Sequence, residues 1–243
     1  MNWKLKIGRL KQAIEQKFIK INSPFIRENF PYGRDWMFDV KRILKNAPVI
    51  VDAGANVGEV SLALNEWFPN ADIYAFEPVS STFNSLTQNT ALKKNIQPIN
   101  MGLGEKNEKI NILLNAENTI NSLKVTEAYD HITGSEAIDI TRLDHFLENE
   151  NLNHVDILKI DVEGFEFEVL NGCGSLIKSG INCIYLEVGY HREPTKVHFS
   201  DVETYMEANE FELCGIYETR RNMHDKRRLW YSNNLYMKKS LLV

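Results

Sequence analysis

Residues 49–58 read Val-Ile-Val-Asp-Ala-Gly-Ala-Asn-Val-Gly, and this stretch decides the fold. The apolar β-branched residues at its start predict a short buried strand that ends at Asp52. Gly54 permits a tight turn and lets a ligand approach the backbone, and Gly58 lies at the start of a helix predicted over residues 57–68. The stretch therefore predicts a strand, a glycine turn and a helix with a ligand at the turn.

The same alternation of strands and helices continues along the chain. Further strands are predicted over residues 73–76, 96–101, 157–160 and 183–188, and helices over 80–94 and 165–178. The helix at 80–94 is expected to open at Ser80 or Ser81, and Ser200 to Glu203 has the spacing of a capping box. A closing strand pair is predicted at 213–217 and 235–237. This order predicts an α/β fold with a doubly wound, mostly parallel sheet, whose ligands bind at the carboxyl ends of the strands.

The 243 residues have ordinary globular composition, with 43% hydrophobic and 25% charged residues. We predict an N-terminal helical extension over residues 1–47 and one ligand-binding domain over residues 48–243. No apolar run approaches the roughly 18 residues of a membrane span, and the lysine-rich start does not resemble a signal peptide. We therefore expect a cytoplasmic protein. Residues 105–140 are long and polar for a connection, and one extra strand is predicted within them at 110–114. We expect this segment to form a lid or a substrate-binding insertion.

Residues 1–21 carry apolar side chains at three- and four-residue steps: Trp3, Ile7, Leu10, Ile14, Phe18 and Ile21. This spacing predicts an amphipathic helix. Two roles are open for it: packing on the domain or a second subunit, or peripheral contact with anionic lipid at the inner face of the membrane. A second helix is predicted from Asp35, as N-cap, to the stop at Pro48.

The net charge of −5 is unevenly distributed. Residues 1–20 carry six Lys and Arg against one acid, and residues 219–243 carry seven against one, which leaves −16 for the segment between them. Such an acidic body argues against nucleic acid as a partner. Five cations lie between the last two predicted strands: Arg220, Arg221, Lys226, Arg227 and Arg228. They are either a solvated charge run or the rim of a cleft for an anionic substrate.

The turn after Asp52 also indicates which ligand it takes. A dinucleotide fingerprint has glycine where this chain has Asn56, and Asp52 would place a carboxylate near the phosphates. Glu77 ends the second predicted strand, 19 residues beyond Gly58, where a carboxylate can accept both hydroxyls of a ribose. A cationic nucleoside without phosphate suits these residues, and the prediction is S-adenosylmethionine.

Four segments carry a resemblance to a known family: VIVDAGANVGEVS (49–61), AFEP (75–78), TRLDHFL (141–147) and DILKIDVEGFEFEVLNG (156–172). They resemble the FkbM-type family of S-adenosylmethionine-dependent O-methyltransferases over roughly residues 48–190. The resemblance implies a seven-stranded class I methyltransferase fold that acts on hydroxyls, commonly of sugars. It also implies a set of cofactor-binding residues, Asp52, Gly54, Asn56, Gly58 and Glu77, with Asp161 as the acid beside the reacting methyl group. We add Pro78 and Gly102 to the predicted cofactor-binding residues.

Methylation of an alcohol requires a group that takes its proton. Asp161 and Glu163 follow the fourth predicted strand, Glu187 ends the fifth, and His191 lies four residues later. We hypothesise that Asp161 or His191 takes the proton and that Glu163 and Glu187 orient the sugar hydroxyls. Two structural alternatives are open: Asp161 as a helix N-cap, and Glu187 with His191 as a surface ion pair. The three acids also form an oxygen-ligand set for a divalent cation, Mg²⁺ or Ca²⁺, which we do not favour.

The sequence therefore predicts an O-methyltransferase that acts on a hydroxyl of a sugar in a glycan, glycolipid or nucleotide sugar. Two alternatives remain open. One is methylation of a polyketide or another small-molecule hydroxyl, and the other is a non-catalytic module that binds S-adenosylmethionine.

Overall fold

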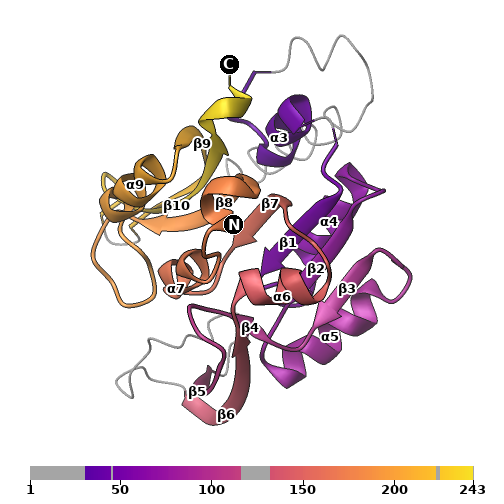
Figure 1. Ribbon diagram of the computed structural model, residues 1–243. Coiled ribbons are helices and arrows are strands. Elements are labelled where there is room, and N and C mark those ends of the chain that lie inside the picture. The colour runs from indigo at the N-terminus through magenta and orange to yellow at the C-terminus, as the bar shows by residue number, and fades with distance from the viewer. Residues whose placement is uncertain (1–30, 45, 116–131, 223–224, 243) are drawn as a thin grey trace, which may run out of the picture.

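A seven-stranded sheet forms the centre of the computed structural model (Figure 1). Its strands, in spatial order, are β3 (Ile96–Ile99), β2 (Asp72–Phe76), β1 (Val49–Ala53), β7 (Val155–Ile160), β8 (Ile181–Gly189), β10 (Leu229–Lys238) and β9 (Phe211–Arg221). Of these, β10 runs antiparallel to both β8 and β9, and the other pairs are parallel. This order confirms the predicted doubly wound, mostly parallel sheet.

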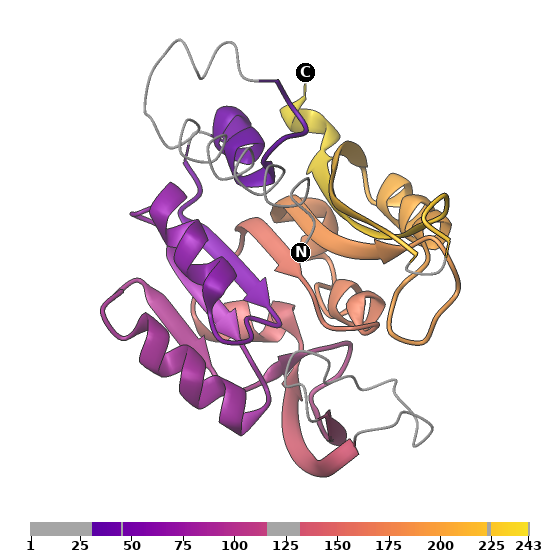
Figure 2. The ribbon, with the colours of Figure 1, turned by 180° about the vertical axis from the view of Figure 1, so that it is seen from behind.

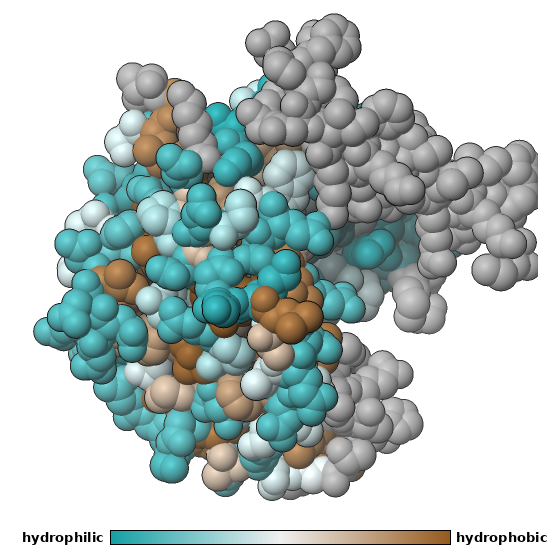
Figure 3. Space-filling view, turned by 90° about the vertical axis from the view of Figure 1, so that its right-hand side faces the viewer, coloured by the Kyte–Doolittle hydropathy of each residue, from teal (hydrophilic) through white to brown (hydrophobic). Residues whose placement is uncertain are grey.

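The structure describes residues 31–44, 46–115, 132–222 and 225–242. The amphipathic helix predicted over residues 1–21 and the middle of the predicted insertion lie outside these ranges. Within them, no helix is both long and apolar enough to cross a membrane. On the face shown in Figure 3, hydrophobic residues are interspersed among hydrophilic ones.

Helices cover both faces of the sheet (Figures 1 and 2). One face packs against α3 (Trp36–Leu44), α4 (Glu59–Trp67) and α5 (Ser80–Thr90). The other packs against α6 (Leu143–Asn149), α7 (Glu166–Asn171), α8 (Leu176–Ser179) and α9 (Phe199–Ala208). A short 3₁₀ helix, η1 (Lys239–Leu241), follows β10.

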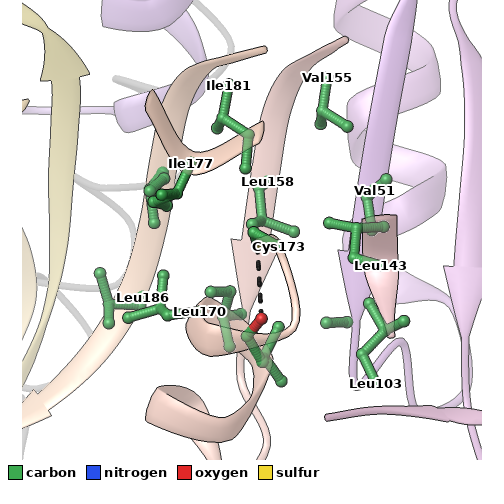
Figure 4. Packing of buried hydrophobic residues seen from close by; sticks show 14 of the residues in the cluster. Val51, Leu103, Leu143, Val155, Leu158, Leu170, Cys173, Ile177, Ile181 and Leu186 are labelled. Carbon is green, nitrogen blue, oxygen red and sulfur yellow. Dashed lines mark hydrogen bonds between the residues drawn. The ribbon is translucent and has the colours of Figure 1, made fainter. Parts of the chain in front are cut away.

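The central strands are buried on both faces, which explains their continuous apolar runs. In β1, Val49 and Val51 belong to one core cluster and Ile50 to the other, because successive side chains point to opposite faces. In Figure 4, Leu158 of β7 and Leu186 of β8 lie in the same cluster as residues of α7 and α8. These strands therefore hold the loops at their carboxyl ends on a rigid base.

The described part of the predicted insertion pairs with β4 (Gly102–Leu103), which lies just before it. Together they form a second, smaller sheet of three strands in the order β4, β6 (Ile132–Thr141) and β5 (Glu108–Asn115). The strand predicted at 110–114 is the centre of β5, whereas β6 was not predicted. Ile112, Ile138 and Ile140 pack with Val79 from the start of α5. The described part of the insertion therefore packs against the main domain at the start of α5.

The predicted starts of α3 and α5 agree with the structure, whereas the capping box predicted for α9 does not. Asp35 does cap α3, because its Oδ1 accepts a hydrogen bond of 3.0 Å from the Phe38 amide. The capping box at Ser200 was wrong: α9 begins at Phe199 after His198, and Glu203 accepts a hydrogen bond from the buried Tyr236 hydroxyl. α5 begins at Ser80 as predicted, but neither serine caps it, and the Ser80 hydroxyl donates to Glu136 of β6.

The last two strands are longer than predicted, which moves part of the basic segment. Arg220 and Arg221 lie in β9, and residues 222–228 form the connection to β10. Because β10 is antiparallel to both neighbours, β9 runs in the same direction as β8. The carboxyl end of β9 therefore lies at the same edge of the sheet as the ends of β7 and β8.

Candidate active site

The turn after β1 has no room for side chains at its two glycines. Gly54 has a φ of +74°, and a Cβ there would lie 2.0 Å from the carbonyl oxygen of Asp161. Gly58 has a φ of +91°, and a Cβ would lie 2.8 Å from Cδ1 of Leu86. Both positions thus need glycine for conformation and for space, so the sequence pattern fixes how closely β1 and β7 approach at this edge.

Glu77 lies directly after β2 and is 7% exposed. Its Oε2 accepts a hydrogen bond from the Asn56 amide and its Oε1 accepts one from the Val79 amide, each 3.0 Å long. Burial raises the pKa of Glu77 above its ordinary value, although these amides and Lys159 oppose the change. Each carboxylate oxygen retains a second lone pair, so the fixed carboxylate can still accept hydrogen bonds from a ligand.

A buried lysine joins β7 to the glycine turn. Nζ of Lys159 lies 3.0 Å from Asp52 Oδ1 and 3.8 Å from Asp161 Oδ2, and it donates a hydrogen bond of 2.8 Å to the Gly54 carbonyl oxygen. Burial lowers the pKa of Lys159, but the two carboxylates outweigh it, so the pKa is raised and the lysine stays charged. Asp52 also accepts a hydrogen bond of 2.6 Å from the Ser61 hydroxyl.

A cavity opens at the carboxyl ends of β1, β2 and β7. It is lined by Gly54, Asn56, Glu77, Pro78, Val79, Gly102, Leu103, Ile112, Ile140, Asp161, Val162, Glu163 and Phe165. The cavity combines carboxylates and exposed turn backbone with an apolar wall. This place, beside the central strand where the sheet order reverses, is where doubly wound folds bind their ligands.

Seven predicted site residues line this cavity: Gly54, Asn56, Glu77, Pro78, Gly102, Asp161 and Glu163. Four others do not: Asp52, Gly58, Glu187 and His191. Asp52 is completely buried behind the turn, in the ion pair with Lys159. Gly58 begins α4. The structure therefore places these two residues where they support the turn.

Both structural alternatives for the acids were wrong. The residue before α7 is Phe165, and no side chain caps that helix, so Asp161 is not its N-cap. Within the described residues, the ion-pair partner of Glu187 is Lys196 and not His191. Nε2 of His191 is buried and forms no hydrogen bond to the described part of the chain.

The turn after β7 carries a second cluster of charged groups. Glu163 has a φ of +50° and Gly164 a φ of +99°, and a Cβ at Gly164 would lie 2.4 Å from the Pro194 carbonyl oxygen. Nζ of Lys196 lies 3.7 Å from Glu163 Oε2. Burial raises the pKa of Glu163 to about 7; Lys196 opposes the rise, and the carboxylates of Asp161 and Glu187 add to it.

Sequence reasoning missed two groups of residues at the site. The first is the apolar wall, formed by Val79, Leu103, Ile112, Ile140 and Phe165. Three of these residues come from the small sheet or its vicinity, so recognition of β6 would have found the wall. The second group consists of the two lysines, Lys159 and Lys196. Lys159 could have been found from the sequence, because a charged residue inside the apolar run of β7 indicates a buried ion pair.

A metal centre has no support from the described residues. No group of three or more His, Cys, Asp or Glu side chains among them is arranged to hold a metal ion. The predicted oxygen set is engaged with lysines, because Lys159 faces Asp161 and Lys196 binds Glu187 and faces Glu163.

Comparison with known proteins identifies the family of this chain. The model of the methyltransferase FkbM domain matches residues 52–213. The chain belongs to the FkbM methyltransferase family. Methyltransferase 1 of Beauveria bassiana is 31% identical over 184 residues, which cover 68% of this chain and 72% of that protein. Hexuronic acid methyltransferase AglP of Haloferax volcanii is 27% identical over 213 residues, which cover 79% of this chain and 85% of that protein.

A solved structure supports the same fold. The crystal structure of methyltransferase FkbM from Methylobacillus flagellatus superposes with a TM-score of 0.50 at 18% identity. The match covers 79% of this chain and 43% of that chain. This FkbM-family chain therefore has the class I methyltransferase fold, with an antiparallel hairpin at the end of a mostly parallel sheet.

S-adenosylmethionine is the methyl donor that the family implies, and the cavity residues suit it. The Glu77 carboxylate is fixed by two amides and can accept from ribose hydroxyls. Gly54 lines the cavity without a side chain, so a ligand can approach the turn closely, and the apolar wall suits a base. None of these features depends on a bound phosphate.

Proposed function

We propose that this FkbM-family protein transfers a methyl group from S-adenosylmethionine to a hydroxyl of a sugar. The observation that carries the proposal is that Asp161 and Glu163 line the same cavity as Glu77. Carboxylates suited to an acceptor hydroxyl thus share a cavity with the carboxylate suited to the donor's ribose. A binding module would not need this second set of acids.

The bound donor supplies an electrophilic methyl group on a cationic sulfur. In our proposal, Glu77 holds the ribose, the turn at Gly54 and Asn56 holds the amino-acid part, and the apolar wall covers the base. Asp161 lines the cavity and is half exposed, so its carboxylate would stabilise the positive charge of the donor. Asp52 acts indirectly, through Lys159, by keeping the turn in place. Positioning of the acceptor is worth up to about 7–11 kcal/mol in such reactions.

The acceptor edge of the sheet supports a sugar that carries a negative charge. Arg220, Lys226 and Arg228 are exposed at the end of the β9–β10 hairpin. Arg221 donates to the carbonyl oxygens of Lys226 and Arg227, at 3.3 and 3.2 Å, and so braces the hairpin connection. A relative named for hexuronic acid, an anionic sugar, points the same way. We therefore propose a uronic-acid-containing glycan or glycolipid as the acceptor class.

The division of the chain is also part of the proposal. Residues 48–243 would form the catalytic domain and residues 1–47 an extension. In the described part of this extension, the Trp36 ring stacks on Tyr185 of β8, with 4.0 Å between ring centroids. The end of the extension therefore packs on the sheet and is not an independent unit.

The test is methyl transfer from donor labelled with deuterium in its methyl group, offered a uronic-acid-containing oligosaccharide and its neutral counterpart. We expect label on a hydroxyl of the acidic sugar, with a KM that rises with salt concentration because screening weakens the attraction. The double charge reversal Arg220→Glu with Arg228→Glu should raise KM, while Lys93→Glu, an exposed lysine after α5, should not. Label on neither sugar would contradict the proposal, and a salt-independent KM would contradict the anionic acceptor.

A further inference from the structure

We propose that Glu163 receives the acceptor proton, and that Lys196 is the positioning residue that holds Glu163 and Glu187 together for this step. The inference rests on the proposed function. It replaces Asp161 and His191 as the proton acceptor, and it gives a role to a lysine that no sequence motif indicated.

The position of Glu163 suits a proton acceptor. Its side chain lines the cavity and is 24% exposed, so it can meet an acceptor hydroxyl and later release the proton to water. Its backbone lies in the left-handed region at a φ of +50°, which is costly for a residue with a side chain. The tight packing of Gly164 against Pro194 holds this turn in place. Strain maintained by the surroundings is typical of functional positions.

The two earlier candidates are less suitable. Asp161 already faces a cation, because its Oδ2 lies 3.8 Å from Nζ of the charged Lys159, and its side chain is 49% exposed to water. In our proposal the negative charge of Asp161 stabilises the positive charge of the donor instead. His191 does not line the cavity, and its Nε2 is buried.

Lys196 connects the ends of two strands. It belongs to the segment between β8 and α9, and its side chain is 9% exposed. Its ammonium group donates a hydrogen bond to Glu187 Oε1, lies 3.7 Å from Glu163 Oε2 and stands 4.5 Å from the centre of the Tyr231 ring. One buried cation thus faces carboxylates from the β7 turn and from β8, and it fixes their separation.

In the described part of the chain, charged groups face Glu163 from several elements: Asp161 from the end of β7, Glu187 from β8, and Lys196 from the segment before α9. Burial and the two acids disfavour the carboxylate, whereas Lys196 favours it. These opposing effects leave the pKa of Glu163 at about 7, and a general base is most effective when its pKa lies near the working pH. Removal of Lys196 should therefore raise the pKa of Glu163.

In the proposed step, the acceptor oxygen loses its proton as it gains the methyl group. A lone pair of the acceptor oxygen forms the new bond to the methyl carbon, and the electron pair of the broken S–C bond stays on sulfur. The hydroxyl proton passes to a Glu163 carboxylate oxygen, which becomes a neutral acid. It then leaves to solvent, because part of the side chain is exposed.

The experiment measures kcat against pH for wild type, Glu163→Gln, Lys196→Met and Lys196→Arg, together with binding of S-adenosylhomocysteine. We expect Glu163→Gln to lower kcat by about 10²–10⁴ and to keep the affinity for S-adenosylhomocysteine within a few-fold. In Lys196→Met, the acidic limb of the profile should move up by about one pH unit or more. Lys196→Arg should restore it, and Lys178→Met, an exposed lysine of α8, should leave it unchanged.

A second measurement does not need turnover. The carboxyl carbon of Glu163, labelled with ¹³C and observed by NMR in the complex with S-adenosylhomocysteine, should titrate near pH 7 in wild type. Its midpoint should be higher in Lys196→Met or, if that variant does not fold, in Lys196→Gln. An unchanged midpoint, or Glu163→Gln turnover within a few-fold of an active wild type, would overturn the inference and leave the proposed function standing. A wild type that methylates no sugar hydroxyl would instead contradict the proposed function.

Discussion

Nζ of Lys159 lies 3.0 Å from Oδ1 of Asp52, and their side chains are 6% and 0% exposed. The pair joins β7 to β1, and the same ammonium group donates to the Gly54 carbonyl oxygen at the start of the ligand turn. A buried ion pair of this kind contributes little net stability, but the loss of one partner leaves the other charge uncompensated. The pair is therefore a fixed link between the fold and the shape of the cavity.

The first prediction concerns this link. Lys159→Met should lower the free energy of unfolding by about 3–5 kcal/mol, because Asp52 would keep a buried charge without a cation. The double variant Lys159→Met with Asp52→Asn should be less destabilised than Lys159→Met alone. Urea denaturation measures both values. A single variant within about 1 kcal/mol of wild type would show that the pair does not hold the turn.

The second prediction tests the space at the turn. Gly54→Ala should abolish binding of S-adenosylhomocysteine or prevent folding, since the added carbon would lie 2.0 Å from the Asp161 carbonyl oxygen. Gly134→Ala, in β6, is the matched control, because no atom of the described residues lies within 4 Å of a Cβ there. Calorimetric titration with S-adenosylhomocysteine should find the control indistinguishable from wild type. Equal binding by both variants would refute the close approach of β1 and β7.

The third prediction concerns the proposed ribose ligand. Glu77→Ala should weaken the binding of S-adenosylhomocysteine by about five- to 150-fold, because a buried polar partner of a ligand hydroxyl is typically worth about 1–3 kcal/mol. Glu148→Ala, an exposed acid of α6, serves as control. Thermal stability should be measured in parallel, since Glu77 also accepts hydrogen bonds from the Asn56 and Val79 amides. If a folded Glu77→Ala variant bound S-adenosylhomocysteine with unaltered affinity, Glu77 would not be a ribose ligand.

Sequence patterns predicted the central sheet well because its determinants are local. A few residues are enough to recognise each determinant. These are the apolar runs of β1 and β7, the glycines at 54 and 58, and the carboxylate of Glu77. The predicted place of Glu77 and Asp161, at the ends of neighbouring strands, follows from parallel strands alone. That is why most predicted cofactor-binding residues line one cavity.

The remaining features depend on contacts between distant segments. Lys196 is 33 residues from Glu163 in the chain, and only the path of the segment after β8 brings them together. The apolar wall required the pairing of β5 with β6, whose register no local pattern specifies. Likewise, Glu203 binds Tyr236 instead of completing a capping box, because a buried hydroxyl requires an acceptor.

The fourth prediction concerns stability and pH. Glu166 is 2% exposed, its Oε1 accepts from the Gly164 amide, and burial raises its pKa to about 8. The folded state therefore binds this proton more tightly than the unfolded chain. Its contribution to stability is complete below the ordinary glutamate pKa and is lost as the pH rises towards 8. Glu166→Gln should consequently raise Tm at pH 8 relative to wild type but not at pH 5.

Thermal unfolding of both proteins across this pH range measures the effect. The matched control is Glu207→Gln, an exposed acid of α9, which should follow the wild-type curve. A constant difference in Tm between Glu166→Gln and wild type at all pH values would show that Glu166 does not titrate in this window.

The most direct test of the account is a crystal structure of the protein with S-adenosylhomocysteine. We expect the nucleoside in the cavity at the ends of β1, β2 and β7, with its ribose hydroxyls on the Glu77 carboxylate and its base against Ile112 and Ile140. A cavity that stays empty at saturating ligand, or a nucleoside whose ribose lies away from Glu77, would contradict the account.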